Sequence, residues 1–152
     1  MIADDTTLTI TNALTNEGTI QSSNILDITT NSVDNQGNII ANNDLDIQSS
    51  NDVTNSGVLH SNTNTIITTD NITNTNTISA TNDLTLKTTT LETTDGEISA
   101  NNVDIQSDTL TSTNTNILAV ENIDLTVQES ISNDGTIQAN KTLSVTTKEL
   151  SN

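Results

Sequence analysis

The stretch "VDNQGNIIANNDLDIQ", residues 33–48, decides the fold, because its pattern returns almost a hundred residues later as "ISNDGTIQANKTLSVT", residues 131–146. In both stretches an aliphatic residue is followed by Asn two positions on, Gly after two more, an aliphatic residue after another two, and then Ala. Few residues are identical, so the spacing is what recurs. A pattern that recurs at a fixed spacing indicates repeated units that stack on one another.

The five glycines show the length of the unit. They lie at positions 18, 37, 57, 96 and 135, with spacings of 19, 20, 39 and 39 residues. The two long spacings predict one unit in each gap that lacks its glycine, with Asn76 and Asn114 in the equivalent places. Since glycine and asparagine are the residues that best adopt positive φ, we expect one left-handed turn in each unit. The predicted turn residues are Gly18, Gly37, Gly57, Asn76, Gly96, Asn114 and Gly135.

Apolar residues then fall into columns. Each unit opens with two aliphatic residues separated by one position: Leu8/Ile10, Leu26/Ile28, Leu45/Ile47, Leu84/Leu86, Val103/Ile105, Ile123/Leu125 and Leu143/Val145, with Thr65 before Ile67 in the remaining unit. A third aliphatic residue follows at Leu14, Val33, Val53, Ile72, Leu91, Leu110, Ile131 and Leu150, and a fourth follows the glycine position. A small residue, Ser or Ala, comes two positions after the fourth.

An apolar spacing of two is the alternation of a β-strand. A unit of three short strands cannot bury its own aliphatic side chains, but stacked units can. We therefore predict an all-β solenoid with 19–20 residues per coil and seven to eight coils, on the order of 35 Å long. The absence of Phe, Tyr, Trp and Pro fits a fold built from aliphatic stacking and unbroken backbone ladders.

One polar column is regular enough to predict a ladder. The residue two positions after the third aliphatic is Asn16, Asn35, Asn55, Asn74, Thr93, Ser112, Asn133 and Asn152. Stacked amides can donate and accept between coils, which would satisfy them inside the solenoid. The alternative is that Asn is present only because it tolerates the turn, and the sequence leaves both open.

The pattern "LxNxGxIxA" followed by "xLxI" resembles the haemagglutinin repeat of filamentous haemagglutinin and of contact-dependent growth inhibition exoproteins. The resemblance extends from about residue 7 to residue 152. It implies a right-handed parallel β-helix, with residues 1–152 forming one segment of a longer shaft. It also implies a secreted or cell-surface bacterial protein of the two-partner secretion type, whose partners include neighbouring coils and an outer-membrane transporter.

Composition excludes several kinds of partner. The formal net charge is −17, and the only basic residues are Lys87, Lys141 and Lys148. No basic patch can be assembled, which argues against nucleic acid and against anionic membranes. No cysteine is available for a disulfide or a thiolate site. The first ten residues contain no basic region followed by an apolar run, so we expect no signal peptide, and no apolar run is long enough to insert into a membrane.

Few residues could support chemistry. His60 is the only histidine, and it flanks the inward-facing Leu59, so we expect it on the surface. A lyase acting on acidic polysaccharides would need a base, cations and a lined groove, which this chain does not offer. An ice-binding face would need a regular Thr-x-Thr array, and the outward positions do not form one. We predict no enzyme activity, no catalytic residues and no cofactor.

Acidic pairs are the only candidates for a metal site. Asp27 with Asp46, and Asp104 with Asp124, lie between the opening aliphatics of consecutive coils, so each pair should stack about one strand spacing apart. Calcium could bridge such carboxylates. The glycine-rich calcium repeat is missing, however, so a solvated acidic face is the favoured reading.

The sequence therefore predicts a structural shaft segment of an adhesin or toxin-delivery exoprotein. The alternative function is an adhesive module that binds a cell-surface glycan or receptor through one face, for which the least polar outward patch contains Ile40, Val58 and His60. Both ends of the repeat lack a cap, so end-to-end association is expected.

Overall fold

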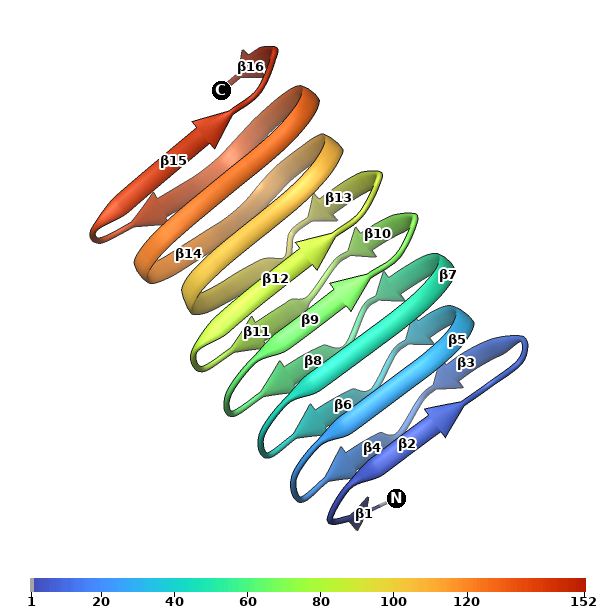
Figure 1. Cartoon of the computed structure of the whole chain (residues 1–152). Coiled ribbons are helices and arrows are strands. Elements are labelled where there is room, and N and C mark those ends of the chain that lie inside the picture. Colours follow the sequence, from blue (N-terminus) through green and yellow to red (C-terminus); the bar gives the residue numbers. More distant parts are fainter. Residues whose placement is uncertain (1) are drawn as a thin grey trace.

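A computed structural model describes residues 2–152 and consists of β-strands joined by turns (Figure 1). The strands are β1 (Ile2–Ala3), β2 (Thr6–Thr9), β3 (Ala13–Asn16), β4 (Thr19–Ser22), β5 (Leu26–Asn35), β6 (Asn38–Ala41), β7 (Leu45–Asn55), β8 (Val58–Ser61), β9 (Thr65–Thr68), β10 (Asn71–Asn74), β11 (Thr77–Ala80), β12 (Asp83–Lys87), β13 (Thr90–Thr94), β14 (Glu97–Ala139), β15 (Thr142–Thr146) and β16 (Glu149–Ser151). The pairings between them are parallel, each strand lying against its equivalent one coil away. The predicted parallel solenoid is confirmed, with about eight turns of about 19 residues.

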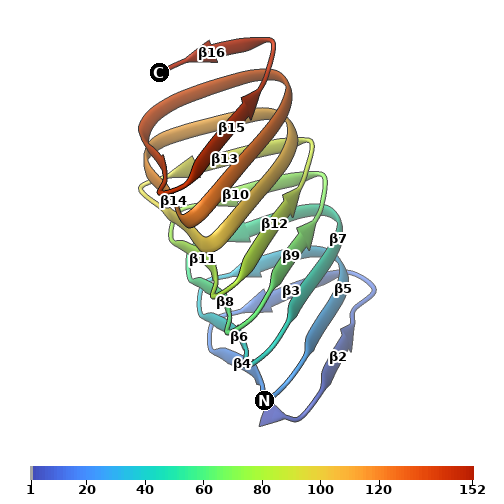
Figure 2. The same ribbon diagram turned by 60° about the vertical axis from the view of Figure 1, so that its left-hand side comes forward.

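Each coil has three faces. The first face contains β2, the start of β5 and β7, then β9, β12, two passages of β14 and β15. The second face begins with β3 and ends with β16, and the third runs from β1 through β4, β6, β8 and β11 into β14. The nearer strands in Figure 1 rise to the right while successive coils advance to the upper left, which makes the solenoid right-handed, as the turned view in Figure 2 also shows.

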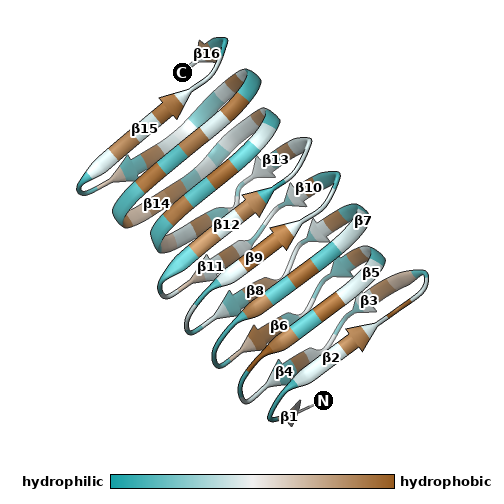
Figure 3. Ribbon diagram, in the orientation of Figure 1, coloured by the Kyte–Doolittle hydropathy of each residue, from teal (hydrophilic) through white to brown (hydrophobic). Residues whose placement is uncertain are grey.

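The core is a set of aliphatic columns along the axis. Inward residues such as Leu26, Ile47, Leu59 and Leu91 are fully buried, and the residues between them face outward. Figure 3 shows this alternation as brown bands separated by teal bands along β14 and by nearly white bands along β15. Because each side chain lies over a similar one in the next coil, Leu, Ile, Val and Ala form one continuous hydrophobic core without aromatic residues.

The first coil differs from the predicted alignment. Thr6 pairs with Leu26 and Leu8 with Ile28, so the opening pair is Thr6/Leu8 and not Leu8/Ile10. Thr6 is buried, as is Thr65 in the same column. The prediction was wrong here because it relied on apolar character alone. A β-branched Thr fits this buried strand position, but because Thr is polar the apolar pattern of the sequence does not reveal it.

Candidate functional site

The best-defined polar feature is the corner between the second and third faces, here called the glycine corner. Four asparagines form a continuous inner column there: Asn16, Asn35, Asn55 and Asn74, each with 6% exposure or less. Each of the first three donates from Nδ2 to Oδ1 of the next, over 2.7, 2.8 and 2.8 Å. The amides point along the axis in one direction, from the N-terminal towards the C-terminal end.

Asn55 shows how completely the amides of this column are hydrogen-bonded. Nδ2 of Asn55 donates to the carbonyl of Gly57 in its own coil at 3.1 Å, to Oδ1 of Asn74 at 2.8 Å and to the carbonyl of Thr77 at 3.0 Å. Its Oδ1 accepts from Asn35. The side chain therefore closes its own corner and joins it to the coils on both sides, which a merely tolerated turn residue would not do.

The glycines in this corner do not form left-handed turns, and that prediction was wrong. Among residues 2–152 no glycine has positive φ. At Gly37 and Gly57 the backbones stack too closely for a side chain: a Cβ on Gly37 would lie 2.0 Å from the carbonyl oxygen of Gly18, and one on Gly57 would lie 2.0 Å from that of Gly37. Later coils place Asn76 and Thr115 at the same position, so glycine is not needed in every coil. At Gly18, by contrast, nothing among the described residues lies within 4 Å of that position.

Two coils build the corner differently. Asn74 pairs with Thr93 and Thr93 with Ser112, so both hydroxyl residues occupy the asparagine column. Two residues, instead of one, then separate them from the glycine position, which holds Gly96 and Thr115. The extra residue is Asp95 in one coil and Asn114 in the next, at φ of 55° and 48°. Positive φ therefore marks an inserted residue, and Asn114 lies one position before the place predicted for it.

The inner column is interrupted at these coils. Asn74 Nδ2 reaches Thr93 Oγ1 only at 3.4 Å, and Thr93 Oγ1 lies 3.2 Å from Thr115 Oγ1. Among the described residues, Ser112 Oγ and Asn133 Oδ1 are buried without a hydrogen-bond partner. The column resumes when Asn133 donates to Asn152 Oδ1 at 2.7 Å.

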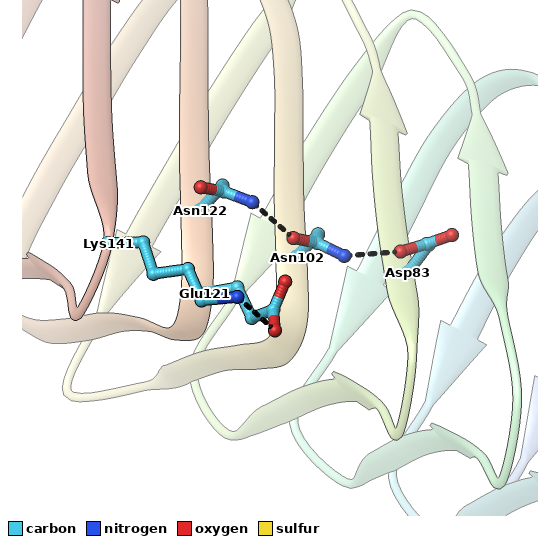
Figure 4. A network of polar contacts seen from close by, with 5 residues as sticks. All are labelled: Asp83, Asn102, Glu121, Asn122 and Lys141. Atoms are coloured by element: carbon cyan, nitrogen blue, oxygen red, sulfur yellow. Dashed lines mark hydrogen bonds and ion pairs between the residues drawn. The ribbon is translucent and has the colours of Figure 1, made fainter.

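On the outside, several carboxylates stack on amides. Figure 4 shows Asn122 Nδ2 donating to Asn102 Oδ1 at 2.9 Å, and Asn102 Nδ2 donating to Asp83 Oδ1 at 2.9 Å. Further pairs of this kind join Asn64 to Asp44, Asn71 to Asp52 and Asn114 to Asp95. In each, an amide from the later coil donates to an acid one coil earlier. This arrangement separates like charges and lets the rod tolerate its net charge of −17.

Asp27 and Asp46 differ from these pairs, since they lie opposite each other in the ladder with no amide between them. Burial raises the pKa of Asp46 above its usual range, the hydrogen bond from Gln48 lowers it, and the neighbouring Asp27 charge raises it further. Asp46 Oδ1 is buried and unpartnered. Asp104 and Asp124 line one shallow hollow on the same face with Asp83, where Gln106 donates to Asp104 at 2.9 Å. Among the described residues, no three His, Cys, Asp or Glu side chains gather as a metal site would require.

His60 lies half-buried on the third face. Its Nδ1 is 2.8 Å from Ser79 Oγ and its Nε2 is 3.1 Å from Asn62 Oδ1. The ring nitrogens thus contact a serine hydroxyl and an amide oxygen, and among the described residues no carboxylate hydrogen-bonds to the ring, as an orienting acid would. Ile40 and Val58 are also half-buried on this face.

The sequence reasoning missed a more exposed apolar place on the third face. Val120 is 62% exposed and lies with Leu118 in a shallow hollow that Ser99, Gln138 and Asn140 complete. The run Ile117–Val120 is a signal for it, because alternation cannot bury four consecutive apolar residues. No helix in the described chain is long and apolar enough to cross a membrane.

Comparison with known families gives one match. The model of the haemagglutinin repeat matches residues 1–57, 26–88, 61–127 and 98–152, and these overlapping matches together cover the whole chain. No curated protein and no solved structure matches the chain.

Proposed function

The chain belongs to the haemagglutinin repeat family, and from that premise we propose that it serves as a spacer in the shaft of a large bacterial exoprotein. Haemagglutinin repeats are typical of adhesin-like exoproteins that are secreted or held at the cell surface, and such segments are typically non-enzymatic. The finer role is a rod segment that separates adhesive or toxic parts from the surface that carries them.

The observation that supports this role is the unbroken stack of similar coils. Each of the eight first-face passages, starting at Thr6, Leu26, Leu45, Thr65, Asp83, Asn102, Asn122 and Thr142, lies in register with its neighbour. The regularly spaced polar side chains hydrogen-bond to one another between coils, in the inner asparagine column and in the outer amide–acid pairs. Because these side chains bond within the rod, the rod is suited to holding two other parts of a protein a fixed distance apart.

The same stack suits export in the unfolded state. A folded coil presents the free edge of its three strands as a template for the following coil, so a chain that emerges from an outer-membrane transporter can fold one coil at a time. The chain has no cysteine that could cross-link before folding is complete. Neighbouring coils of the parent protein and the transporter are therefore the proposed partners.

Coil duplication tests the spacer role. Residues 26–64 form two coils, because Leu26, Leu45 and Thr65 occupy one column, so a second copy of this segment inserted before Thr65 keeps the register. The variant should fold and lengthen the rod by about 10 Å, two strand spacings, in small-angle X-ray scattering. A variant that fails to fold, or a rod of unchanged length, would contradict the proposal.

An adhesive module is the second candidate, favoured by the exposed Val120 and its neighbour Leu118 on the third face. A glycan array and a cell-binding assay on the 152-residue chain separate the two roles. The spacer role predicts no binding above background. Binding abolished by Val120→Asp would assign the third face to recognition and overturn the purely structural proposal.

A further inference from the structure

The third face differs from the other two in charge. Its strands β4, β6, β8 and β11 lie side by side (Figure 1) and continue into three passages of β14, residues 97–100, 116–119 and 136–139. Within these described strands Glu97 is the only charged residue. The strands of the first face contain Asp27, Asp46, Asp83, Lys87, Asp104 and Asp124, and those of the second contain Asp34, Asp52, Glu92 and Glu149. Two copies with a net charge of −17 each can therefore approach through the third face with the fewest like charges in contact.

Apolar side chains lie at two separate places on this face. Ile40 and Val58 are half-buried on β6 and β8, the second and third of the seven strand passages when β4 is counted as the first. Leu118 is half-buried on the sixth passage, and Val120, directly after it, is 62% exposed. Ser79 on β11 lies at the middle of the seven, so the two apolar places are at similar distances on either side of it.

The outward residues of the third face come in nearly the same order from either end of the rod. The central outward column is Gln21, Ile40, His60, Ser79, Ser99, Leu118 and Gln138. The column beside it is Thr19, Asn38, Val58, Thr77, Glu97, Asn116 and Thr136. Reversing the columns about β11 places Gln against Gln, Ile against Leu, Thr against Thr and Asn against Asn. The unlike pairs are His60 with Ser99 and Val58 with Glu97.

We propose that two copies of this chain pair side by side through their third faces, with the rods antiparallel and a twofold axis along β11. Rotation about the strand direction keeps each outward column against itself and reverses the order of the coils, which is the reversal that the two columns tolerate. The faces then pack like two sheets about 10 Å apart, and the same patch is used on both copies. This pairing goes beyond the spacer role and does not depend on it.

The antiparallel register brings the two apolar places together. Ile40 of one copy lies against Leu118 and Val120 of the other, and the twofold axis repeats this contact at the opposite end of the interface. The exposed Val120 side chain is thereby removed from water. At the axis Ser79 meets its own equivalent, and this small side chain lets the two faces approach closely.

The one acid of the face does not oppose the pairing. The two Glu97 side chains lie two strand spacings apart along the rods, about 10 Å, so they do not face each other directly. Each carboxylate already accepts a hydrogen bond from Ser99 Oγ at 2.7 Å within its own chain. The neighbour diagonally across the interface is His60 of the second copy, the only histidine of the chain.

The size of the face sets the strength of the pair. Six coil intervals and the width of the outward columns give a flat area of about 29 Å by 13 Å, or roughly 400 Å² per copy. A stable complex buries about 800 Å² per partner, so this pair should be weak, with dissociation in the micromolar to millimolar range. Because a twofold interface closes on itself, dimers are the largest species expected.

Sedimentation velocity in about 0.15 M salt, over concentrations up to about 1 mM, tests the pairing. Val120→Asp should weaken the dimer about tenfold, because it places a charge against Ile40 of the second copy. Asn42 occupies the reversed position opposite Val120, so adding Asn42→Lys to Val120→Asp should restore the dimer. Ile66→Asp is the matched control, since Ile66 is 40% exposed on the first face, and it should leave association unchanged.

A chain that stays monomeric to about 1 mM would overturn the proposal and leave the third face to a different partner. Association that Val120→Asp does not weaken, or that Ile66→Asp weakens equally, would overturn it because another surface would be responsible. Failure of the double variant to recover association would contradict the antiparallel register.

Cross-linking tests the position of the axis directly, since the chain contains no cysteine of its own. With a reagent that joins two thiols about 10 Å apart, Ser79→Cys should link to a second copy of itself. Gln21→Cys should not link to itself, but it should link to Gln138→Cys when the two variants are mixed. Self-linking of Gln21→Cys would show that the rods are parallel and would overturn the proposal.

Discussion

The glycine corner is built in two ways within one chain. In the coils of Asn16, Asn35 and Asn55, one residue separates Asn from Gly, and the amide bonds to its own coil and to the next. In the coils of Thr93 and Ser112, two residues separate the column from the glycine position, and a left-handed Asp95 or Asn114 takes up the extra length. The amide ladder stops where the extra residue begins.

The difference shows what the asparagine column contributes. Backbone pairing continues through both kinds of corner, and β14 runs without interruption from Glu97 to Ala139. The ladder is therefore not needed to form a coil. Its contribution is a set of buried, directional bonds that hold the spacing of a short corner, and the irregular coils substitute weaker hydroxyl contacts.

Removing one asparagine of the column should give the largest difference in stability between the two kinds of corner. Asn55→Ala removes an amide whose two N–H groups face three acceptors, and it leaves the buried Asn35 amide with one fewer acceptor, so we expect a loss of about 4 kcal/mol. Thr93→Ala, at the same place in an irregular coil, should cost only about 1 kcal/mol. Urea unfolding followed by circular dichroism measures both. Equal losses would mean that the ladder contributes nothing beyond packing.

Adding a methyl group tests the close backbone approach. Gly37→Ala places a Cβ 2.0 Å from the carbonyl oxygen of Gly18 and should destabilise the protein by about 3 kcal/mol, because backbone must move. Gly18→Ala is the matched control, with open space at the same corner position, and should be nearly neutral. The two midpoints of thermal unfolding should separate clearly; coincident midpoints would contradict the steric account.

Converting the two irregular corners to the regular form should raise the stability of the protein, which tests the same comparison by a gain in place of a loss. Replacing residues 93–96 by Asn-Thr-Gly and residues 112–115 by Asn-Thr-Gly removes both left-handed residues and restores the column between Asn74 and Asn133. The gain should be about 2 kcal/mol, since new amide bonds form between coils, the unpartnered Ser112 hydroxyl is removed and Asn133 Oδ1 gains a donor. A variant less stable than the native chain in chemical denaturation would show that the extra residues fit a local requirement that the column does not explain.

The smallest effect concerns the outer columns, where Asp27 and Asp46 stack without an amide between them. Because the folded pKa of Asp46 is raised, the native chain loses stability as pH rises through the interval above the ordinary value of 3.8. Asp46→Asn should therefore stabilise the protein by about 0.5 kcal/mol at pH 7, and the gain should vanish below pH 3.8. Melting curves across pH 3–8 give the profile, and a gain that grows at low pH would have the wrong sign.

The sequence was sufficient for the coil length, the aliphatic columns and the alignment of Asn55 with Asn35 and Asn74, because period and alternation depend only on spacing. It left open whether the aligned amides bond to one another. The sequence was insufficient where two different structural reasons would select the same residue type. Gly37 is explained equally well by positive φ and by close stacking, and only coordinates separate them. Thr6 in the core carries no apolar signal, and a one-residue insertion such as Asp95 shifts the register without changing composition.

The distance along one outward column tests the central claim, that equivalent residues of successive coils lie directly over one another. Thr9, Thr29, Gln48, Thr68, Lys87, Gln106 and Thr126 form such a column. Spin labels at Thr9→Cys and Thr126→Cys are separated by six coil intervals, so pulsed electron spin resonance should give one narrow distance near 29 Å. A broad distribution, or a distance far from this value, would contradict a continuous stack of coils.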